Sequence, residues 1–237
     1  MIPLEKFLQD YNIKKAKDLE HKDPQFLALQ NCRNNIKNKN ENLFLYLVIQ
    51  CSIVSYQIAW SGELWRTEFW EKVQKDWNTL LNIRNKNESN TERRFSFLKS
   101  SKNNKRIYNI KKSRIEKLNK VLQNEKNFSK YHNDLKKLNR ILAKTMWTKI
   151  YSKTIVFAIK MFGYAYTIIS WKEINYPNNI NIPVDSRLKK IYSLNTDKET
   201  TNEIEICEYF NKLSQNFNIP PLDLDTILRL DYRKMIK

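Results

Sequence analysis

Lys153 and Asp185 are the two residues whose types and spacing most readily suggest chemistry. Lys153 opens the helix-like run Lys153–Met161, and Asp185 lies in Ile182–Arg187, just after a loop rich in proline and asparagine. A lysine at a helix start and an aspartate after such a loop can meet in one cleft. A lysine is nucleophilic only as the free amine, a form that burial favours because desolvation disfavours the charge. The pair therefore predicts amine chemistry.

Asp185 does not explain a reactive amine, since a nearby carboxylate stabilises the ammonium form. Its better role is as a proton acceptor, or as a negative charge that stabilises a cationic, sugar-like transition state. Ser152, Thr154 and the apolar helix that follows are compatible with partial burial of Lys153. The alternative is that both side chains are solvated surface groups, as most lysines and aspartates are.

The elements that must position these residues are predicted to be helices throughout. The chain has only two glycines, and it lacks the alternating segments bounded by glycine-rich turns that indicate strands. Asp23–Pro24 predicts a helix start, because aspartate caps helices and proline fits the first turn. We expect further helices over Leu43–Trp60, from Gly62, over Leu135–Leu142, from Lys153, over Val184–Tyr192, over Thr200–Phe217 and after Pro221, the last capped by Asp223 or Asp225. Loops are expected over Asn82–Glu92, Trp147–Tyr151 and Tyr176–Pro183.

The segment between Leu43 and Glu63 carries no formal charge and approaches the length of a transmembrane helix. Polar residues interrupt it, namely Gln50, Ser52, Ser55, Gln57 and Ser61. A buried core helix is therefore the favoured interpretation, and no basic-then-apolar signal peptide opens the chain. We expect no membrane association.

The charge balance indicates a polyanionic partner. The 237 residues carry a formal net charge of +18, with 12% aromatic residues, which together favour nucleic acid. A lysine-rich bias of the whole proteome is the alternative. The three cysteines form no Cys-x-x-Cys and only two histidines occur, so the sequence predicts a reducing, cytoplasmic setting and argues against zinc, iron–sulfur and histidine-based metal sites. The length allows one large domain or two small lobes.

The most basic stretch runs from Lys99 to Lys120 and contains a single acidic residue, Glu116. Lysine and arginine side chains of this kind contact phosphates and position DNA without reading its sequence. A solvated helix face is the alternative. We expect contacts to the DNA backbone at Lys99, Lys102, Lys105, Arg106 and Lys149.

Lys153–Met161 followed by Ile182–Arg187 resembles the archaeal GO glycosylase (AGOG) family of helix–hairpin–helix DNA glycosylases. Further similarity continues in order along most of the chain, through Ser55–Glu63, Glu68–Phe69, Phe97–Asn104 and Pro220–Asp225. The resemblance implies an all-α fold with two helical lobes around a cleft, in a single domain over residues 1–237. The hairpin that bears the lysine would be Leu142–Ser152, and the hairpin with its catalytic helix would span residues 142–163.

The resemblance also implies an activity, the removal of 8-oxoguanine from DNA. Lys153 would attack C1′ of the damaged nucleoside, and the resulting Schiff base would permit β-elimination, so that the enzyme is also an AP lyase. Asp185 matches the family's catalytic aspartate, and no cofactor is implied. A monomer acting on double-stranded DNA is expected, with single-stranded DNA left open. Two alternatives stand beside this: a glycosylase for another damaged or mismatched base, and a non-enzymatic basic helical protein that binds nucleic acid.

A target base must leave the stack and enter a pocket, where aromatic faces sandwich it. Phe157 lies one helical turn after Lys153, so both can face the same cleft. The resemblance points to Phe157 as one stacking face and to Trp65 as the other, although a tryptophan on such a helix is often a core residue. Lys160, further along the same helix, is expected to reach a phosphate or the pocket.

Recognition of 8-oxoguanine needs an acceptor for its N7–H, because guanine presents an acceptor at that position. Gln25 resembles the family's glutamine at this site. Asp225 resembles an aspartate that contacts the base edge, and helix capping is its alternative role. Arg229 stands where the family has an aromatic residue, one turn after that aspartate, which leaves the pocket wall and the preferred lesion open.

Overall fold

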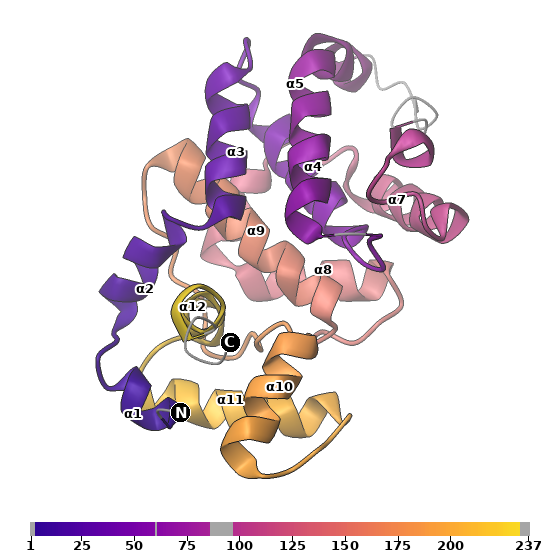
Figure 1. The fold of residues 1–237 in the computed structure, drawn as a ribbon. Helices are drawn as coiled ribbons and strands as arrows, with labels where there is room; N and C mark the ends of the chain where they lie inside the picture. The colour runs from indigo at the N-terminus through magenta and orange to yellow at the C-terminus, as the bar shows by residue number, and fades with distance from the viewer. Residues whose placement is uncertain (1–2, 60, 86–96, 233–237) are drawn as a thin grey trace.

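The computed structural model describes residues 3–59, 61–85 and 97–232, and every regular element in this part of the chain is helical (Figure 1). The predicted all-α class is confirmed. In chain order the elements are α1 (Leu4–Leu8), α2 (Ile13–Glu20), α3 (Pro24–Asn35), α4 (Glu41–Ile53), α5 (Gly62–Asn85), α7 (Tyr108–Leu122), η1 (Phe128–Asn133), α8 (Leu135–Thr145), α9 (Lys153–Ser170), α10 (Ser186–Thr196), α11 (Glu203–Phe217), α12 (Pro221–Ile227) and η2 (Leu228–Tyr232).

Helices α4 and α9 form the centre of the larger of two apolar clusters (Figure 1). Every residue of α4 from Leu43 to Ile53 is buried, which accounts for the uncharged run, because a helix that is apolar all round must lie inside the protein. The buried helix is confirmed, but it ends at Ile53 and not at Trp60. Among the helices of the described residues, none is both long and apolar enough to cross a membrane.

The smaller apolar cluster joins the two ends of the chain. Leu4, Leu8 and Ala16 from α1 and α2 are buried with residues of α10, α11 and α12, such as Phe210 and Leu224. In Figure 1 the indigo α2 and the yellow α12 lie side by side, although they lie near opposite ends of the sequence. The buried apolar residues of α9 belong to the larger cluster and those of α10 belong to the smaller one, so the two helices that carry Lys153 and Arg187 belong to different clusters.

Of the two helix caps that the sequence predicted, one is confirmed and one is wrong, and a further helix start differs from the predicted one. Asp23 caps α3 by accepting a hydrogen bond from the Gln25 backbone N–H at 2.8 Å, as expected. Asp185 is the N-cap of α10, so this helix begins at Ser186 and continues past Tyr192 to Thr196. The predicted cap of α12 by Asp223 or Asp225 is wrong, because both lie inside the helix and Pro220 is its N-cap.

Two further boundaries in the structure differ from the predicted ones. Helix α5 continues to Asn85, into the stretch expected to be a loop from Asn82, and the rest of that loop lies outside the described residues. The hairpin before α9 covers residues 146–152, since α8 continues to Thr145, and α9 continues beyond Gly163 to Ser170.

Gly163 has a clear packing role in positioning the segment that leads to Asp185. The Tyr176 hydroxyl, after the turn that follows α9, donates a hydrogen bond to the Lys160 carbonyl oxygen at 3.1 Å. A β-carbon at Gly163 would lie 2.7 Å from Tyr176 Cε1, closer than side chains pack. Glycine therefore lets the segment after α9 return against that helix.

Candidate active site

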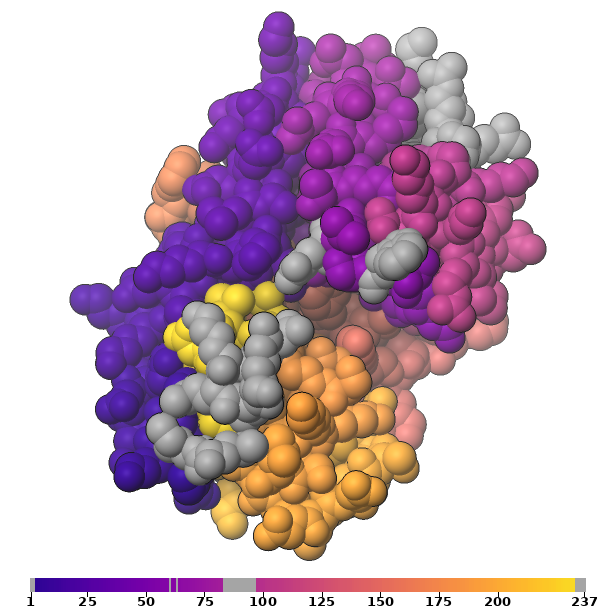
Figure 2. Space-filling model, in the orientation of Figure 1, coloured from indigo at the N-terminus to yellow at the C-terminus, as the bar shows by residue number. Residues whose placement is uncertain are grey.

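A cleft of about 920 Å³ lies between elements of both apolar clusters. Its walls come from the start of α3, the loop 55–61, the first turns of α5 and α9, the start of α10, and α12 with η2. In Figure 2 the salmon surface of the α8–α9 region is set back between the violet segment above it and the orange α10 below. The cleft brings together six of the residues predicted from sequence: Gln25, Lys153, Phe157, Lys160, Asp185 and Asp225.

Lys153 is the first residue of α9 and stands at the mouth of the cleft. A hairpin presents it: the Thr148 N–H donates to the Ala143 carbonyl at 3.0 Å, and the Thr148 and Ser152 hydroxyls hydrogen-bond at 2.6 Å. The expectation of partial burial was wrong, because Lys153 is exposed. The apolar side chains of α9 point away from this face into the core, so they leave the first lysine in solvent.

Asp185 reaches the cleft from the N-terminus of α10. Its Oδ1 accepts a hydrogen bond from the Leu188 N–H at 3.0 Å, and its Oδ2 lies 3.3 Å from Arg187 Nη2. Lys153 lines the same cleft, but the ion pairs of the described residues include none between Lys153 and Asp185. The structure thus brings Lys153 and Asp185 to one cleft, but the carboxylate of Asp185 pairs with Arg187.

Asp225 and Lys160 form a buried ion pair at the inner end of the cleft. Lys160 Nζ lies 2.6 Å from Asp225 Oδ2, with 1% and 4% of the two side chains exposed. Burial lowers the pKa of Lys160, and Asp225 only partly offsets it. Burial opposes ionisation of Asp225, yet Lys160 and then Arg187 hold its pKa well below the usual range. Lys160 is therefore a wall of the pocket and not an exposed phosphate contact.

Gln25 is buried and lines the same cleft as this pair. Its side-chain Oε1 is buried and has no hydrogen-bond partner among the described residues. An acceptor left in this state is costly, and most buried polar groups in folded proteins find a partner. Gln25 therefore brings a buried amide oxygen without a partner among the described residues to the lining of the cleft.

Arg229 also lines the cleft, where it pairs with Asp23. Its Nη1 donates to Asp23 Oδ1 at 3.0 Å, and Tyr164 Oη donates to Asp23 Oδ2 at 2.8 Å. Burial would raise the pKa of Asp23, but Arg229 holds it below its usual range. Because Asp23 also caps α3, this arginine helps to fix the helix start that carries Gln25.

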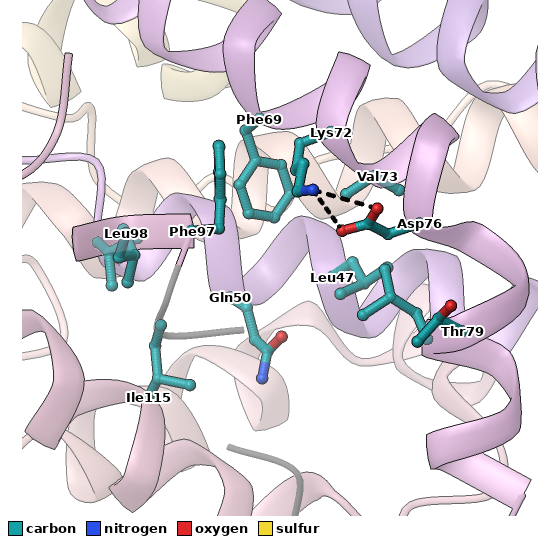
Figure 3. Close-up of a pocket in the computed structure, with 12 residues that line it drawn as sticks. Leu47, Gln50, Phe69, Lys72, Val73, Asp76, Thr79, Phe97, Leu98 and Ile115 are labelled. Atoms are coloured by element: carbon teal, nitrogen blue, oxygen red, sulfur yellow. Dashed lines mark hydrogen bonds and ion pairs between the residues drawn. The ribbon is translucent and has the colours of Figure 1, made fainter. Parts of the chain in front are cut away.

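Phe157 is half-buried on the cleft wall, where the Arg66 guanidinium lies 5.6 Å from the centre of its ring. The structure does not bring Trp65 to this wall. Its indole is fully buried, lies nearly parallel to the Phe97 ring at 5.7 Å, and donates to Ser55 Oγ at 2.9 Å. Phe97 in turn lines a separate apolar cavity of about 70 Å³ (Figure 3). In this conformation Trp65 is a core residue, which leaves its predicted stacking on a base without support.

The loop 55–61 is held in place by residues that the family resemblance pointed to. Glu68 accepts hydrogen bonds from Ser101 Oγ at 2.9 Å and from the Lys102 N–H at 2.9 Å. The Ala59 N–H donates to the Asn103 carbonyl at 2.9 Å, which ties the cleft loop to this second loop. These residues therefore support the cleft wall.

Two cations of the basic stretch lie beneath the cleft loop. Lys111 is fully buried, donates to the Asn104 carbonyl at 3.3 Å, and lies 5.2 Å from the centre of the Tyr56 ring. Burial, with a contribution from Arg106, lowers the pKa of Lys111 to about 8. Arg114 stacks over the same ring at 4.5 Å and donates to the Ile53 carbonyl at 3.0 Å. Both side chains brace the loop from within.

The five predicted contacts to the DNA backbone are all exposed: Lys99, Lys102, Lys105, Arg106 and Lys149. Lys102 lies on the loop that supports the cleft wall, and Lys149 lies in the hairpin before Lys153. Exposed cations next to a cleft are available for phosphates, since such contacts need no burial.

Sequence reasoning missed Arg66 and Arg187 as cleft residues. Arg187 was part of the quoted segment Ile182–Arg187, but nothing in its neighbours showed which carboxylates it would reach. For Arg66, the available signal was its position one helical turn after Gly62. This spacing places both residues on one face of the helix, and that face lines the cleft.

The described residues thus form a helical fold in which a lysine, a carboxylate and Gln25 line one cleft, in a chain with a formal net charge of +18. Residues 5–234 match the AGOG family, N-glycosylase/DNA lyase. The chain is 40% identical over 221 residues to an N-glycosylase/DNA lyase of Methanococcus maripaludis, covering 92% of this chain and 82% of the relative. It is 35% identical over 228 residues to an N-glycosylase/DNA lyase of Nanoarchaeum equitans, covering 95% and 88%. The chain belongs to the AGOG family.

A solved structure shares the fold. It is the crystal structure of Pa-AGOG, an 8-oxoguanine DNA glycosylase from Pyrobaculum aerophilum, in complex with 8-oxoguanosine. The two chains superpose with a TM-score of 0.77 at 23% sequence identity, over 95% of this chain and 84% of the other. The expected helical glycosylase fold is thereby confirmed.

Proposed function

We propose that this protein excises 8-oxoguanine from DNA and then cleaves the strand at the resulting abasic site, using Lys153 as the nucleophile. The membership in a family of N-glycosylase/DNA lyases and the fold shared with an 8-oxoguanine DNA glycosylase support the activity and the lesion. The single observation that carries the site is that Gln25, whose buried Oε1 has no hydrogen-bond partner among the described residues, lines the same cleft as Lys153 and Asp185.

In this proposal the Lys153 amine forms a bond to C1′ while the C1′–N9 bond breaks and the base leaves with its electron pair. Loss of an amine proton and opening of the sugar give a Schiff base. Removal of a proton from C2′ then expels the 3′ phosphate by β-elimination, and water releases the lysine from the cleaved strand. Lys153 stands exposed before DNA arrives, so the DNA itself must supply the desolvation that favours the free amine.

The lesion is proposed to be recognised through Gln25 and Asp225, with Phe157 as one stacking face. The N7–H of 8-oxoguanine would donate to Gln25 Oε1, whereas guanine would place its N7 lone pair against that oxygen. Phe157 is half-buried on the cleft wall, as a stacking platform requires. Arg229 stands where the family has an aromatic residue, so the pocket can prefer another lesion. The assay therefore includes a panel of damaged and mismatched duplexes.

The proposed partner is double-stranded DNA bound by a monomer, with the exposed cations around the cleft as backbone contacts. We also infer that the two apolar clusters correspond to two helical lobes of a single domain. The cleft lies between elements of both clusters, as expected for a base that enters between lobes.

Borohydride trapping tests the nucleophile. Wild-type protein should become covalently attached to a duplex that contains 8-oxoguanine, and Lys153→Gln should not, since an amide cannot form a Schiff base. Lys144→Gln, which removes an exposed lysine of α8 outside the cleft, is the matched control and should trap as wild type does. Trapping by Lys153→Gln at the wild-type level would assign the nucleophile to another residue, and an inactive wild type on every lesion would favour a non-enzymatic binder.

A further inference from the structure

Arg187 lies between two carboxylates that belong to different parts of the site. It is the second residue of α10, and its Nη2 lies 2.7 Å from Asp225 Oδ1 and 3.3 Å from Asp185 Oδ2. The exposed fractions of the three side chains are 15% for Arg187, 4% for Asp225 and 25% for Asp185. One guanidinium nitrogen thus joins the carboxylate nearest the proposed chemistry to the carboxylate of the base pocket.

The Asp225 end of this link is held firmly. Its second oxygen, Oδ2, lies 2.6 Å from the fully buried Lys160 amine on α9. The carboxylate therefore has a cation on each oxygen, and α12 cannot move it without breaking a buried ion pair. Among the described ion pairs, loss of Arg187 would leave Asp225 paired with Lys160 and would leave Asp185 without a cation.

The Asp185 end is held less completely. Asp185 Oδ1 is used in the cap of α10, so Oδ2 is the oxygen that faces Arg187, at a longer distance than the contact to Asp225. Arg187 Nε is buried and has no hydrogen-bond partner among the described residues. The guanidinium therefore keeps an unused donor and has a tight contact on one side and a looser contact on the other.

We propose that Arg187 is a positioning residue that orients Asp185 and makes its position depend on what Asp225 contacts. This inference rests on the proposed function. A base edge that donates to Asp225 competes with Arg187 for that carboxylate, and the guanidinium then moves its contact toward Asp185. An abasic site places no base against Asp225, so release of the base depends on Arg187 and cleavage at an existing abasic site does not.

The test compares two substrates in single-turnover reactions. Arg187→Ala is expected to slow release of 8-oxoguanine about 100-fold, the size of effect that follows from misplacing a reacting group by about 1 Å. Borohydride trapping on a duplex with a preformed abasic site should change by less than about 3-fold, since that step does not use the link. Guanidinium ion added to Arg187→Ala should restore part of base release.

Two further variants make the result specific. Arg187→Lys keeps the charge but lacks the planar guanidinium that reaches two carboxylates. It should therefore slow base release more than trapping, as Arg187→Ala does, but by a smaller factor. Lys189→Met removes a charge from the neighbouring position of α10, outside the cleft lining, and should leave both reactions at wild-type rates.

The inference is overturned if wild type is active and Arg187→Ala releases the base at the wild-type rate. It is also overturned if both reactions fall together and guanidinium restores neither, because a general structural loss would do that. If Arg187→Ala does not fold, as judged by circular dichroism, the ratio of the two reactions in Arg187→Lys decides. Absence of both activities in wild type would instead contradict the proposed function.

Discussion

Asp185 Oδ2 lies 3.3 Å from Arg187 Nη2. A direct ion pair between the aspartate and the proposed nucleophile would stabilise the ammonium form of the lysine, which cannot attack. The described contacts of Asp185 engage Arg187 and the Leu188 N–H instead, while Lys153 lines the same cleft from the start of α9. The arrangement therefore places a carboxylate in the cleft of the proposed nucleophile without pairing it with that amine.

Asp185→Asn should reduce release of the base by about 100-fold or more, because it removes the negative charge and the proton acceptor. Asparagine also caps helices, so the hydrogen bond from the Leu188 N–H and the start of α10 should persist. DNA affinity, measured by fluorescence anisotropy, should stay close to that of wild type. Asp197→Asn, at the exposed C-terminal end of the same helix, is the control. Equal excision by Asp185→Asn and wild type would remove Asp185 from the mechanism.

Gln25→Ala should weaken the preference for 8-oxoguanine over guanine by about 10-fold to 100-fold, the usual effect of deleting one buried acceptor from a recognition site. The measurement is the ratio of single-turnover excision rates, or of affinities for uncleaved analogues, on matched duplexes. Gln30→Ala changes the same residue type on α3 outside the cleft and should not alter that ratio. An unchanged preference in Gln25→Ala would show that the unpaired Oε1 is not the lesion acceptor.

DNA binding should weaken steeply with salt, because lysine and arginine side chains that bind phosphates release counterions. Replacing Lys102, Lys105 and Arg106 together by glutamine should lower the slope of log affinity against log salt by about 0.9 for each phosphate that the variant no longer neutralises. A triple variant at three exposed lysines elsewhere, Lys14, Lys198 and Lys212, removes the same charge and should lower the slope less. Binding that hardly changes across the titration would contradict the assignment of these residues to the DNA backbone.

Folding stability should fall as the pH rises from about 4.5 to about 7, because of Glu20. Burial raises the pKa of Glu20 from 4.5 to about 7, although Lys17 opposes this, so in that window the folded protein keeps a proton that the unfolded chain has released. The stabilisation is complete below 4.5 and is lost as the pH passes the folded pKa. The shift from 4.5 to about 7 corresponds to about 3 kcal/mol.

Urea unfolding of wild type and Glu20→Gln between pH 4.5 and 7.5 measures this dependence. The variant cannot titrate and should show a flatter profile than wild type over that range. Glu71→Gln, an exposed glutamate on α5, should keep the wild-type slope. Parallel profiles for wild type and Glu20→Gln would contradict the raised pKa.

The sequence determined the local elements and the order of residues on one helix face. Aspartate followed by proline predicted the start of α3, and the helical period placed Lys153 and Phe157 on one side of α9 with the apolar residues on the other. The uncharged run predicted a buried helix because a long apolar segment has no stable place in water. These features depend on neighbours within a few residues, which the sequence contains.

Only the tertiary structure decided which groups pair and which stay open. Asp225 meets Lys160 and Arg187 across separations of 65 and 38 residues. It lies inside α12, where it cannot cap the helix, and its carboxylate is used in these distant contacts. Trp65 lies on the helix that the sequence predicted from Gly62, yet the Phe97 ring packs against its indole. Burial of a polar or aromatic side chain depends on what packs against it from distant segments, and no local pattern records that. The unpaired acceptor of Gln25 and the shared guanidinium of Arg187 therefore appear only once the helices are packed.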